Sequence, residues 1–165
     1  MSAEKKKQLS VLGLIVALVV VMFGSLLFVG AVAGWFDDPK VTLDAEYICE
    51  GECSGEFMEL SAADYDKLVA ERKSFVVFVD QNGCTTADRL RGYVRDFATS
   101  HGVRVYRMMF NDLKETSLHS EVKYYPSVVV VDKGAVRAYL RADSDEDAEM
   151  YNDYGVFEGW MGRYF

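Results

Sequence analysis

The sequence predicts an α/β domain with a mixed sheet and helices on both faces, preceded by one N-terminal transmembrane helix. Three observations support this prediction. Apolar strand-like segments alternate with helical segments through most of the chain, and a hairpin turn joins the last two apolar segments. The chain also carries no charged residue between Gln8 and Phe36. These features predict one domain of ordinary size behind a membrane anchor.

The uncharged N-terminal segment is long enough to cross a membrane. Residues 11–36 form a run of 26 residues in which Ser25 is the only hydroxyl side chain. About 20 apolar residues in a helix span the hydrocarbon core of a bilayer. The lysines at 5–7 precede this run and the aspartates at 37–38 follow it, so the positive-inside bias places the N-terminus in the cytoplasm.

Two other interpretations of this segment compete with the anchor. A buried core helix is usually shorter and shows a polar face. A cleaved signal peptide fits the small-x-small pattern at 31–33, but its apolar region usually has only about 7–15 residues. We therefore expect a single-pass protein of the cell membrane. Its predicted parts are a cytoplasmic tail over 1–8, a transmembrane helix over 9–36, an extracytoplasmic extension over 37–55 and a folded extracytoplasmic domain over 56–165.

The part beyond the anchor is strongly acidic. The whole chain has 18 basic and 26 acidic side chains, of which three lysines and one glutamate precede the apolar run. Residues 37–165 thus carry 15 basic and 25 acidic groups, a net charge of −10. Such a charge disfavours nucleic acids and anionic lipid headgroups as partners. An extracytoplasmic location also allows disulfides to persist.

The first elements of the outer domain are two short strands and a helix. Residues 41–48 and 57–60 are the strand candidates. Ser61 is predicted to cap the helix, with Asp64 at the capping-box position. Residues 74–80 are almost continuously apolar, which is typical of a strand buried on both faces.

A second helix is predicted to begin at Cys84 and to end near Ser100, with Gly102 as its C-cap. The acidic start of the last segment suits a helix N-terminus, and Met150, Tyr154, Phe157 and Met161 recur at helical spacing as core positions. The remaining elements are expected in this order: a strand over 103–110, a short helical or irregular stretch over 111–123, a strand over 127–131, a turn at 132–134, a strand over 135–141 and a helix from 143 toward 165.

Cys84 is the residue that most strongly indicates chemistry. It follows a buried strand through a turn that contains glycine, and it begins a helix. The free N–H groups and partial positive charge of a helix N-terminus stabilise a thiolate, which is the reactive form of cysteine. The alternative is a buried cysteine that acts as a small apolar side chain.

These residues resemble the thioredoxin-like superfamily. The resemblance comprises VVFVDQNGCTTA, the Tyr125-Pro126-Ser127 step before a strand and the turn at 132–134. Pro126 follows Cys84 by 42 residues, about the separation seen in thioredoxins. The resemblance covers residues 56–165 and implies a three-layer thioredoxin-like sandwich. It also implies that Pro126 is cis and faces Cys84, and that Tyr125 and Pro126 hold an extended substrate segment.

Three departures from the family pattern restrict the chemistry that is expected. Ala87 stands where the family's oxidoreductases have their second cysteine, Phe78 where they have a buried acid, and Gly83 where they have a tryptophan. A disulfide reductase releases its mixed disulfide through the second thiolate. Ordinary dithiol turnover is therefore not expected within this motif.

Cys49 and Cys53 leave three hypotheses open. They could form their own disulfide, or one of them could resolve or bridge Cys84. They could also bind a metal, as Cys-x₃-Cys does in thioredoxin-fold copper-delivery proteins. Here the pair lies ahead of the first core strand, and neither His101 nor His119 has an evident link to it. We therefore expect no metal site and no cofactor.

The sequence thus predicts a membrane-anchored extracytoplasmic thioredoxin-like protein that forms mixed disulfides through Cys84. Protein thiols or disulfides, or another protein partner, are the expected partners, and nucleic acid is not. The alternative is a redox-inactive module that binds a protein through the same fold, and a third hypothesis is metal delivery. Whether the chain is an enzyme stays open at this point.

Overall fold

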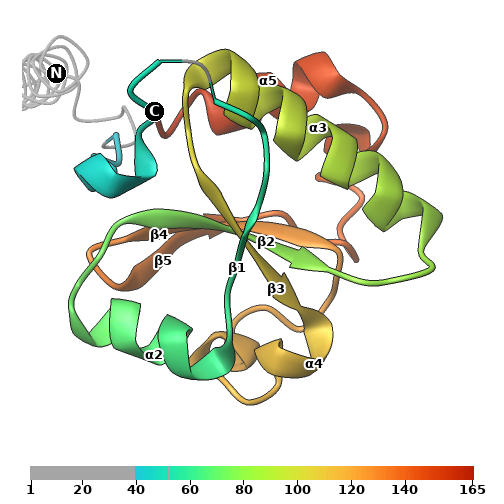
Figure 1. Ribbon diagram of the computed structural model, residues 1–165. Coiled ribbons are helices and arrows are strands. Elements are labelled where there is room, and N and C mark those ends of the chain that lie inside the picture. The colour runs from blue at the N-terminus through green and yellow to red at the C-terminus, as the bar shows by residue number, and fades with distance from the viewer. Residues whose placement is uncertain (1–39, 52) are drawn as a thin grey trace, which may run out of the picture. The chain divides into compact units, whose positions relative to one another are not determined.

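Five strands form one mixed sheet in the order β1-β3-β2-β4-β5. The computed structural model describes residues 40–51 and 53–165, and Figure 1 shows how their elements are arranged. The strands are β1 (Met58–Glu59), β2 (Phe75–Asp80), β3 (Val105–Met109), β4 (Ser127–Asp132) and β5 (Ala135–Tyr139). β1, β3 and β2 are mutually parallel, whereas β4 is antiparallel to β2 and β5 is antiparallel to β4. The predicted mixed sheet and terminal hairpin are confirmed.

Helices cover both faces of this sheet. Figure 1 shows α3 and α5 on one face and α2 and α4 on the other, which confirms the three-layer arrangement. The α-helices are α2 (Ala62–Ala70), α3 (Thr85–His101), α4 (Phe110–Leu113) and α5 (Tyr154–Met161). Short 3₁₀ helices are η1 (Ala45–Tyr47), η2 (Ser117–Ser120) and η3 (Ala148–Tyr151).

The ends of two helices form as their sequences predict. The Ser61 hydroxyl accepts the backbone N–H of Asp64 at 3.2 Å and donates to the Asp64 carboxylate at 2.6 Å. This pair satisfies one of the free N–H groups at the start of α2. At the end of α3, Gly102 takes a left-handed conformation with φ of 65°, and its N–H bonds to the carbonyl of Ala98. Glycine adopts that conformation without strain from a side chain.

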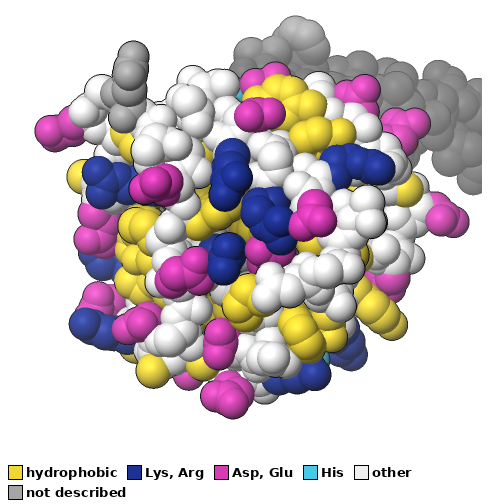
Figure 2. All heavy atoms as spheres, turned by 45° about the vertical axis from the view of Figure 1, so that its right-hand side comes forward, with side chains coloured by type: hydrophobic (Ala, Val, Ile, Leu, Met, Phe, Trp, Pro, Cys, Tyr) yellow, Lys and Arg dark blue, Asp and Glu magenta, His cyan; other side chains and the backbone are white. Residues whose placement is uncertain are grey.

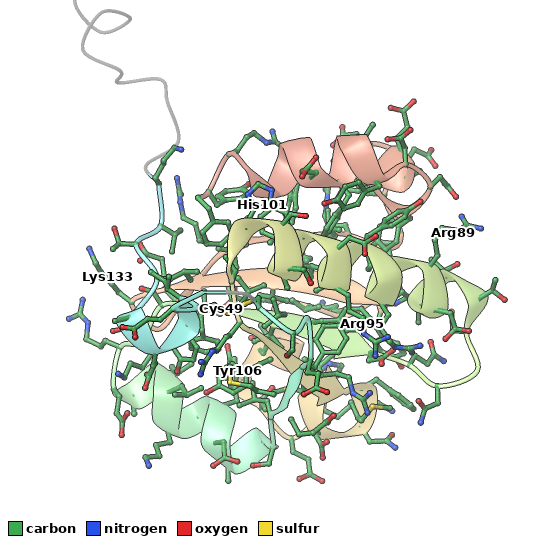
Figure 3. The ribbon with its side chains drawn as sticks, turned by 45° about the horizontal axis from the view of Figure 1, so that its top comes forward. Cys49, Arg89, Arg95, His101, Tyr106 and Lys133 are labelled. Atoms are coloured by element: carbon green, nitrogen blue, oxygen red, sulfur yellow. A yellow bond between two sulfur atoms is a disulfide. The ribbon has the colours of Figure 1, made fainter. Side chains whose placement is uncertain are left out.

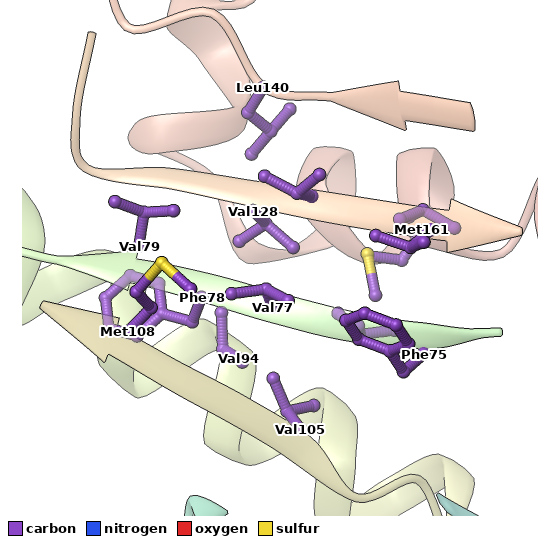
Figure 4. Close-up of a cluster of buried hydrophobic side chains, with 14 of the residues drawn as sticks. Phe75, Val77, Phe78, Val79, Val94, Val105, Met108, Val128, Leu140 and Met161 are labelled. Atoms are coloured by element: carbon purple, nitrogen blue, oxygen red, sulfur yellow. The ribbon is translucent and has the colours of Figure 1, made fainter. Parts of the chain in front are cut away.

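The core lies on both sides of the two central strands. All six residues of β2 are buried, and so are the first five of β4. Figure 4 shows side chains of β2, β3 and β4 packed with residues of α3 and α5. Phe157 and Met161 of α5 are completely buried, and Met150 of η3 and Tyr154 of α5 pack against the same cluster. The helical stripe predicted near the C-terminus is therefore core packing.

The predicted strand over 41–48 is wrong. Instead the segment is extended only in part and contains η1, with a single antiparallel bridge from Ile48 to Val103. Its backbone groups find partners outside the sheet: the N–H of Val41 bonds to the carbonyl of Tyr164, and that of Asp44 to the carbonyl of Ser74. Its alternating apolar residues nevertheless enter the core, where Val41, Leu43 and Tyr47 are buried. Residues 40–51 therefore pack into the same compact unit, Lys40–Phe165, although the sequence predicts them as part of an extension.

The helix predicted from residue 143 begins later. The Asp147 carboxylate accepts the backbone N–H of Arg141, and the Arg141 guanidinium binds Glu146, so the acidic residues form turns instead of a first helical turn. The α-helix starts after Asp153, whose carboxylate accepts the N–H of Val156 at 3.0 Å. Aspartate side chains favour such caps and turns because they bond to nearby backbone groups.

The predicted cytoplasmic tail and transmembrane helix, residues 1–8 and 9–36, lie outside the described residues. Within residues 40–51 and 53–165, no helix is both long enough and apolar enough to cross a membrane.

Candidate functional site

Cys84 lies at the first turn of the longest described helix. It is the N-cap of the 17-residue α3, with φ of −108° and ψ of 117°, and its side chain is partly exposed. The backbone carbonyl of Cys84 accepts the N–H of Asp88 at 3.0 Å, which closes the first helical turn. The thiol is thus held where the unpaired N–H groups and the helix dipole favour a negative charge.

The segment that leads to Cys84 depends on one glycine. Gly83 has φ of 73°, a conformation that other residues rarely adopt, and a Cβ atom there would meet no atom within 4 Å. The requirement at this position is therefore conformational. The family's tryptophan is absent here, and the glycine turns the chain from β2 into α3.

Pro126 lies at the same edge of the sheet as this segment. The Tyr125–Pro126 peptide bond is cis, and Ser127, which follows it, pairs with Val79 near the end of β2. Because β2 and β4 are antiparallel, the start of β4 and the end of β2 meet at one edge. Cys84 and Pro126 are thereby both brought to that edge.

Aromatic side chains hold the Tyr125–Pro126 step in place. The Tyr151 hydroxyl donates to the Pro126 carbonyl at 3.0 Å, and the Tyr125 ring stacks on Phe110 with centroids 5.0 Å apart. Burial raises the pKa of Tyr151, so its hydroxyl stays protonated as a donor. Tyr124, the residue before this step, is 54% exposed.

A hollow of about 300 Å³ adjoins the start of α3. Its walls come from Thr86 and from the segment after β5, and are formed by Thr86, Ala142, Asp143, Ser144, Asp145, Ala148, Tyr151 and Asn152. Tyr151 links this hollow to Pro126 through the hydrogen bond described above. The edge that carries Cys84 is thus indented on one side and aromatic at Tyr124 and Tyr125.

The sequence does not predict a network of charges around Asp80, the one fully buried member of that network. Asp80, at the end of β2, is completely buried and forms a two-pronged ion pair with Arg91 of α3. Arg107 of β3 lies 3.9 Å from the same carboxylate and 3.2 Å from Glu59. Figure 2 shows dark blue and magenta side chains interspersed on one face of the molecule. The sequence does contain a signal for this ion pair, because Asp80 is the one charged residue in the otherwise apolar run 74–80. A buried charge requires a partner of opposite charge.

The two positions where the family has its second cysteine and buried acid are now parts of the core. Ala87 and Phe78 are both completely buried. Asp80 is not a substitute for the acid, because its oxygens already accept hydrogen bonds from Arg91 and from the N–H of Gln81. The site therefore offers one thiol and no neighbouring base of the family type.

Cys49 and Cys53 form a disulfide with Cα atoms 5.7 Å apart, and it lies at the other end of α3. The N–H of Cys49 bonds to the carbonyl of Gly102 at 2.8 Å, directly after the C-terminus of α3. In Figure 3 Cys49 lies toward the His101 end of this helix, whereas Arg89 marks the opposite end. A helix of 17 residues is about 25 Å long. The pair is thus placed too far from Cys84 to resolve or bridge it in this fold.

Removing this disulfide is expected to affect stability and not the chemistry of Cys84. The closed loop has only five residues, so the double variant Cys49→Ser/Cys53→Ser should lose about 2 kcal/mol of unfolding free energy. The rate of Cys84 alkylation should stay within about twofold of the wild type, because the two sites are distant. Urea unfolding and timed alkylation with iodoacetamide measure the two quantities. A large fall in the alkylation rate at unchanged fold would show that the sites are coupled.

The described residues hold no cluster that suits a metal ion. Within 40–51 and 53–165, no three His, Cys, Asp or Glu side chains are grouped as a metal site. While the Cys49–Cys53 disulfide is intact, the pair offers no thiolate to a metal ion.

Comparison with known proteins shows no sequence family. No family model matches this chain, and no curated protein matches it. Solved structures with similarity include oxidised thioredoxin from Plasmodium falciparum, at 12% identity and a TM-score of 0.47, covering 64% of this chain and 98% of that one. A thioredoxin variant from Halobacterium salinarum shares 15% identity at a TM-score of 0.48, covering 67% and 91%. Oxidised thioredoxin O2 from Arabidopsis thaliana shares 13% identity at a TM-score of 0.46, covering 70% and 100%.

The fold assignment depends on the domain's own features. They are the mixed sheet in the order β1-β3-β2-β4-β5, helices on both faces, a cis proline before β4 and a cysteine at the start of the helix after β2. These features agree with the resemblance found in the sequence. The described domain, Lys40–Phe165, therefore has a thioredoxin-like fold.

Proposed function

We propose that this chain is a membrane-anchored extracytoplasmic protein that handles protein thiols and disulfides through the single thiol of Cys84. The observation that carries the proposal is the placement of Cys84. Of the three cysteines, all of which the structure describes, it is the free one, and it is partly exposed at the start of α3. Pro126 reaches the same edge.

The proposed reaction is one thiol–disulfide exchange. The Cys84 thiolate attacks one sulfur of a substrate disulfide, a bond forms between Cys84 and that sulfur, and the other substrate sulfur leaves as a thiolate. A second thiolate, from the substrate or from a separate dithiol protein, then attacks the substrate sulfur of the mixed disulfide, forms a new disulfide bond with it and releases the Cys84 thiolate. A dithiol protein that acts here ends as a disulfide and leaves the substrate reduced. When the thiolate that leaves in the first exchange and the thiolate that attacks the mixed disulfide belong to the same substrate, no oxidant or reductant is consumed. The reaction is then an isomerisation or a temporary capture.

The membrane location belongs to the same proposal. The segment over 9–36 is uncharged and long enough for a spanning helix, and the lysines at 5–7 favour a cytoplasmic N-terminus. The domain would then occupy a compartment in which disulfides persist, as the Cys49–Cys53 bond requires. Its substrates would be protein segments that meet the domain beside the membrane.

The test uses the full-length protein in detergent micelles, first reduced at Cys84 and then exposed to oxidised glutathione. We expect one glutathione on Cys84 by peptide mass spectrometry, in seconds to minutes at neutral pH, and complete loss of this adduct in Cys84→Ser. The double variant Cys49→Ser/Cys53→Ser is the matched control, because it keeps Cys84 as the one cysteine. An unreactive Cys84 in the folded wild type would refute the redox proposal. A membrane-impermeant maleimide added to intact cells tests the placement, since only an extracytoplasmic Cys84 would be labelled.

One observation favours a second candidate, a redox-inactive protein-binding module. Completely buried Ala87 leaves no resolving thiol in the motif, and the other two cysteines are paired at the far end of α3. Under that proposal Cys84→Ser would leave partner capture unchanged in crosslinking from intact membranes. Loss of a covalent partner in Cys84→Ser, visible on a non-reducing gel, would favour the redox function.

A further inference from the structure

The Arg91 guanidinium connects the two ends of the segment that presents Cys84. Its Nε and Nη2 donate to the two carboxylate oxygens of Asp80 at 3.0 and 2.7 Å. Its Nη1 donates to the carboxylate of Asp88 at 2.7 Å. The Arg91 side chain is 20% exposed and that of Asp80 is fully buried, so the pair is largely shielded from water. Hydrogen bonding to Asp80 raises the pKa of Arg91, which therefore stays charged.

Both aspartates bound by Arg91 also contact the backbone that carries the thiol, Asp80 through its carboxylate and Asp88 through its backbone N–H. Asp80 precedes the segment 81–84, and its Oδ1 accepts the N–H of Gln81 at 2.7 Å. Asp88 lies one turn after Cys84, and its N–H bonds to the Cys84 carbonyl at 3.0 Å. The Asp80 carboxylate therefore fixes the start of the segment 81–84, and Arg91 joins that carboxylate to the side chain of Asp88 in the first turn of α3.

The charge of Asp88 makes this connection relevant to chemistry. Asp88 lies in the first turn of α3, the position where a carboxylate opposes a nearby thiolate, and its side chain is 61% exposed. The attached Arg91 offsets that charge. Arginine suits this role because its planar fork binds one carboxylate with two donors while a third donor binds another, whereas all the donors of lysine are on a single nitrogen.

Building on the proposed reaction of Cys84, we propose that Arg91 is a positioning residue for this thiol. It holds the start of the segment 81–84 to the first turns of α3 and offsets the charge of Asp88, which lies one helical turn after Cys84. Arg91 touches neither substrate nor sulfur in this role and acts through its two carboxylate partners. The reactivity of Cys84 then depends on a residue two helical turns away.

The test measures the pH profile of Cys84 alkylation by iodoacetamide in the full-length protein. We expect Arg91→Gln to move the profile to higher pH and to lower the rate at pH 7 by about 3- to 10-fold, because the thiolate is the reactive form of cysteine. Adding Asp88→Asn to Arg91→Gln should return the rate to within about twofold of the wild type, because the opposing charge is then absent.

The matched control is Arg95→Gln. It removes the same charge from the same helix, but the Arg95 guanidinium lies over the Phe57 ring at 5.5 Å and has no link to Asp80 or Asp88 among the contacts of the described residues. Its alkylation rate and profile should equal those of the wild type. An equal shift in Arg95→Gln and Arg91→Gln would show a general charge effect and would overturn the positioning role.

A variant that keeps the buried pair intact guards against failure to fold. Asp88→Asn alone should change the alkylation rate by less than about twofold, because Arg91 already neutralises that carboxylate. A clear shift of its profile to lower pH would contradict the inference. An Arg91→Gln protein that melts at a lower temperature but keeps the wild-type profile would show that Arg91 is only structural. By contrast, a wild-type Cys84 that does not react at all would defeat the proposed function itself.

Discussion

Phe78→Ala is expected to lower the free energy of unfolding by about 3–5 kcal/mol, the usual cost of removing a buried phenylalanine ring. Phe78 is completely buried in the middle of β2, opposite Val128 of β4 and Arg107 of β3. Its ring also packs on Phe57 with centroids 5.6 Å apart. The two central strands cannot move closer to fill the space, because their own ladders fix their spacing. Urea unfolding followed by circular dichroism measures the loss.

Val156→Ala is the matched control for this prediction. Val156 lies on α5 and is 39% exposed, so its truncation should change stability by no more than about 0.5 kcal/mol. If Phe78→Ala lost less than about 1.5 kcal/mol, the core around β2 would have to be looser than the structure shows.

Gly134→Ala is expected to cost at least about 2 kcal/mol. Gly134 has φ of 78° in the β4–β5 turn, and its N–H bonds to the Lys73 carbonyl at 2.9 Å. A Cβ atom there would collide with the carbonyl oxygen of Val69 and lie 3.3 Å from Arg72 Cα. A left-handed alanine costs about 1–2 kcal/mol, and forcing the turn away from α2 adds about 1–3 kcal/mol. Thermal unfolding should show the loss directly.

Gly92→Ala should raise the free energy of unfolding, whereas Gly134→Ala lowers it. Gly92 lies inside α3, and an added Cβ would meet nothing within 4 Å. Alanine is the better helix former by about 0.5–1 kcal/mol, so Gly92→Ala should stabilise the domain. Equal effects at both glycines would contradict the close contact between the β4–β5 turn and α2.

The sequence predicts the central elements well because several local signals agree there. The apolar run from Phe75 to Val79 can satisfy its burial only as a central strand, and Ser61 with Asp64 specifies a helix start from its own backbone chemistry. Cys84 at the start of α3 follows from the same logic, since a turn with Gly83 must separate the strand from the helix.

The incorrect predictions have a shared physical cause, which is that specific contacts override the local pattern, whether their partners are distant in sequence or only a few residues away. The alternation over 41–48 looks like a strand, but the N–H of Val41 bonds to Tyr164, which is more than 100 residues away in sequence. The acidic segment after Arg141 has the composition of a helix start, but the guanidinium of Arg141 binds Glu146 and the segment forms turns instead. The link from Asp80 to Arg91 is equally invisible, because it depends on the packing of α3 on β2.

The separation of the two sulfur sites by the length of α3 has a consequence for how this protein can be oxidised and reduced. The free thiol and the disulfide lie at opposite ends of α3, so they cannot undergo thiol–disulfide exchange with each other within one molecule. Cys84 and the Cys49–Cys53 pair are therefore oxidised and reduced independently of each other. Each can be oxidised or reduced, which gives four states of the molecule, and the population of each state is the product of the two separate equilibria. A titration of total thiols would be fitted by two uncoupled steps, one involving a single sulfur and the other a pair.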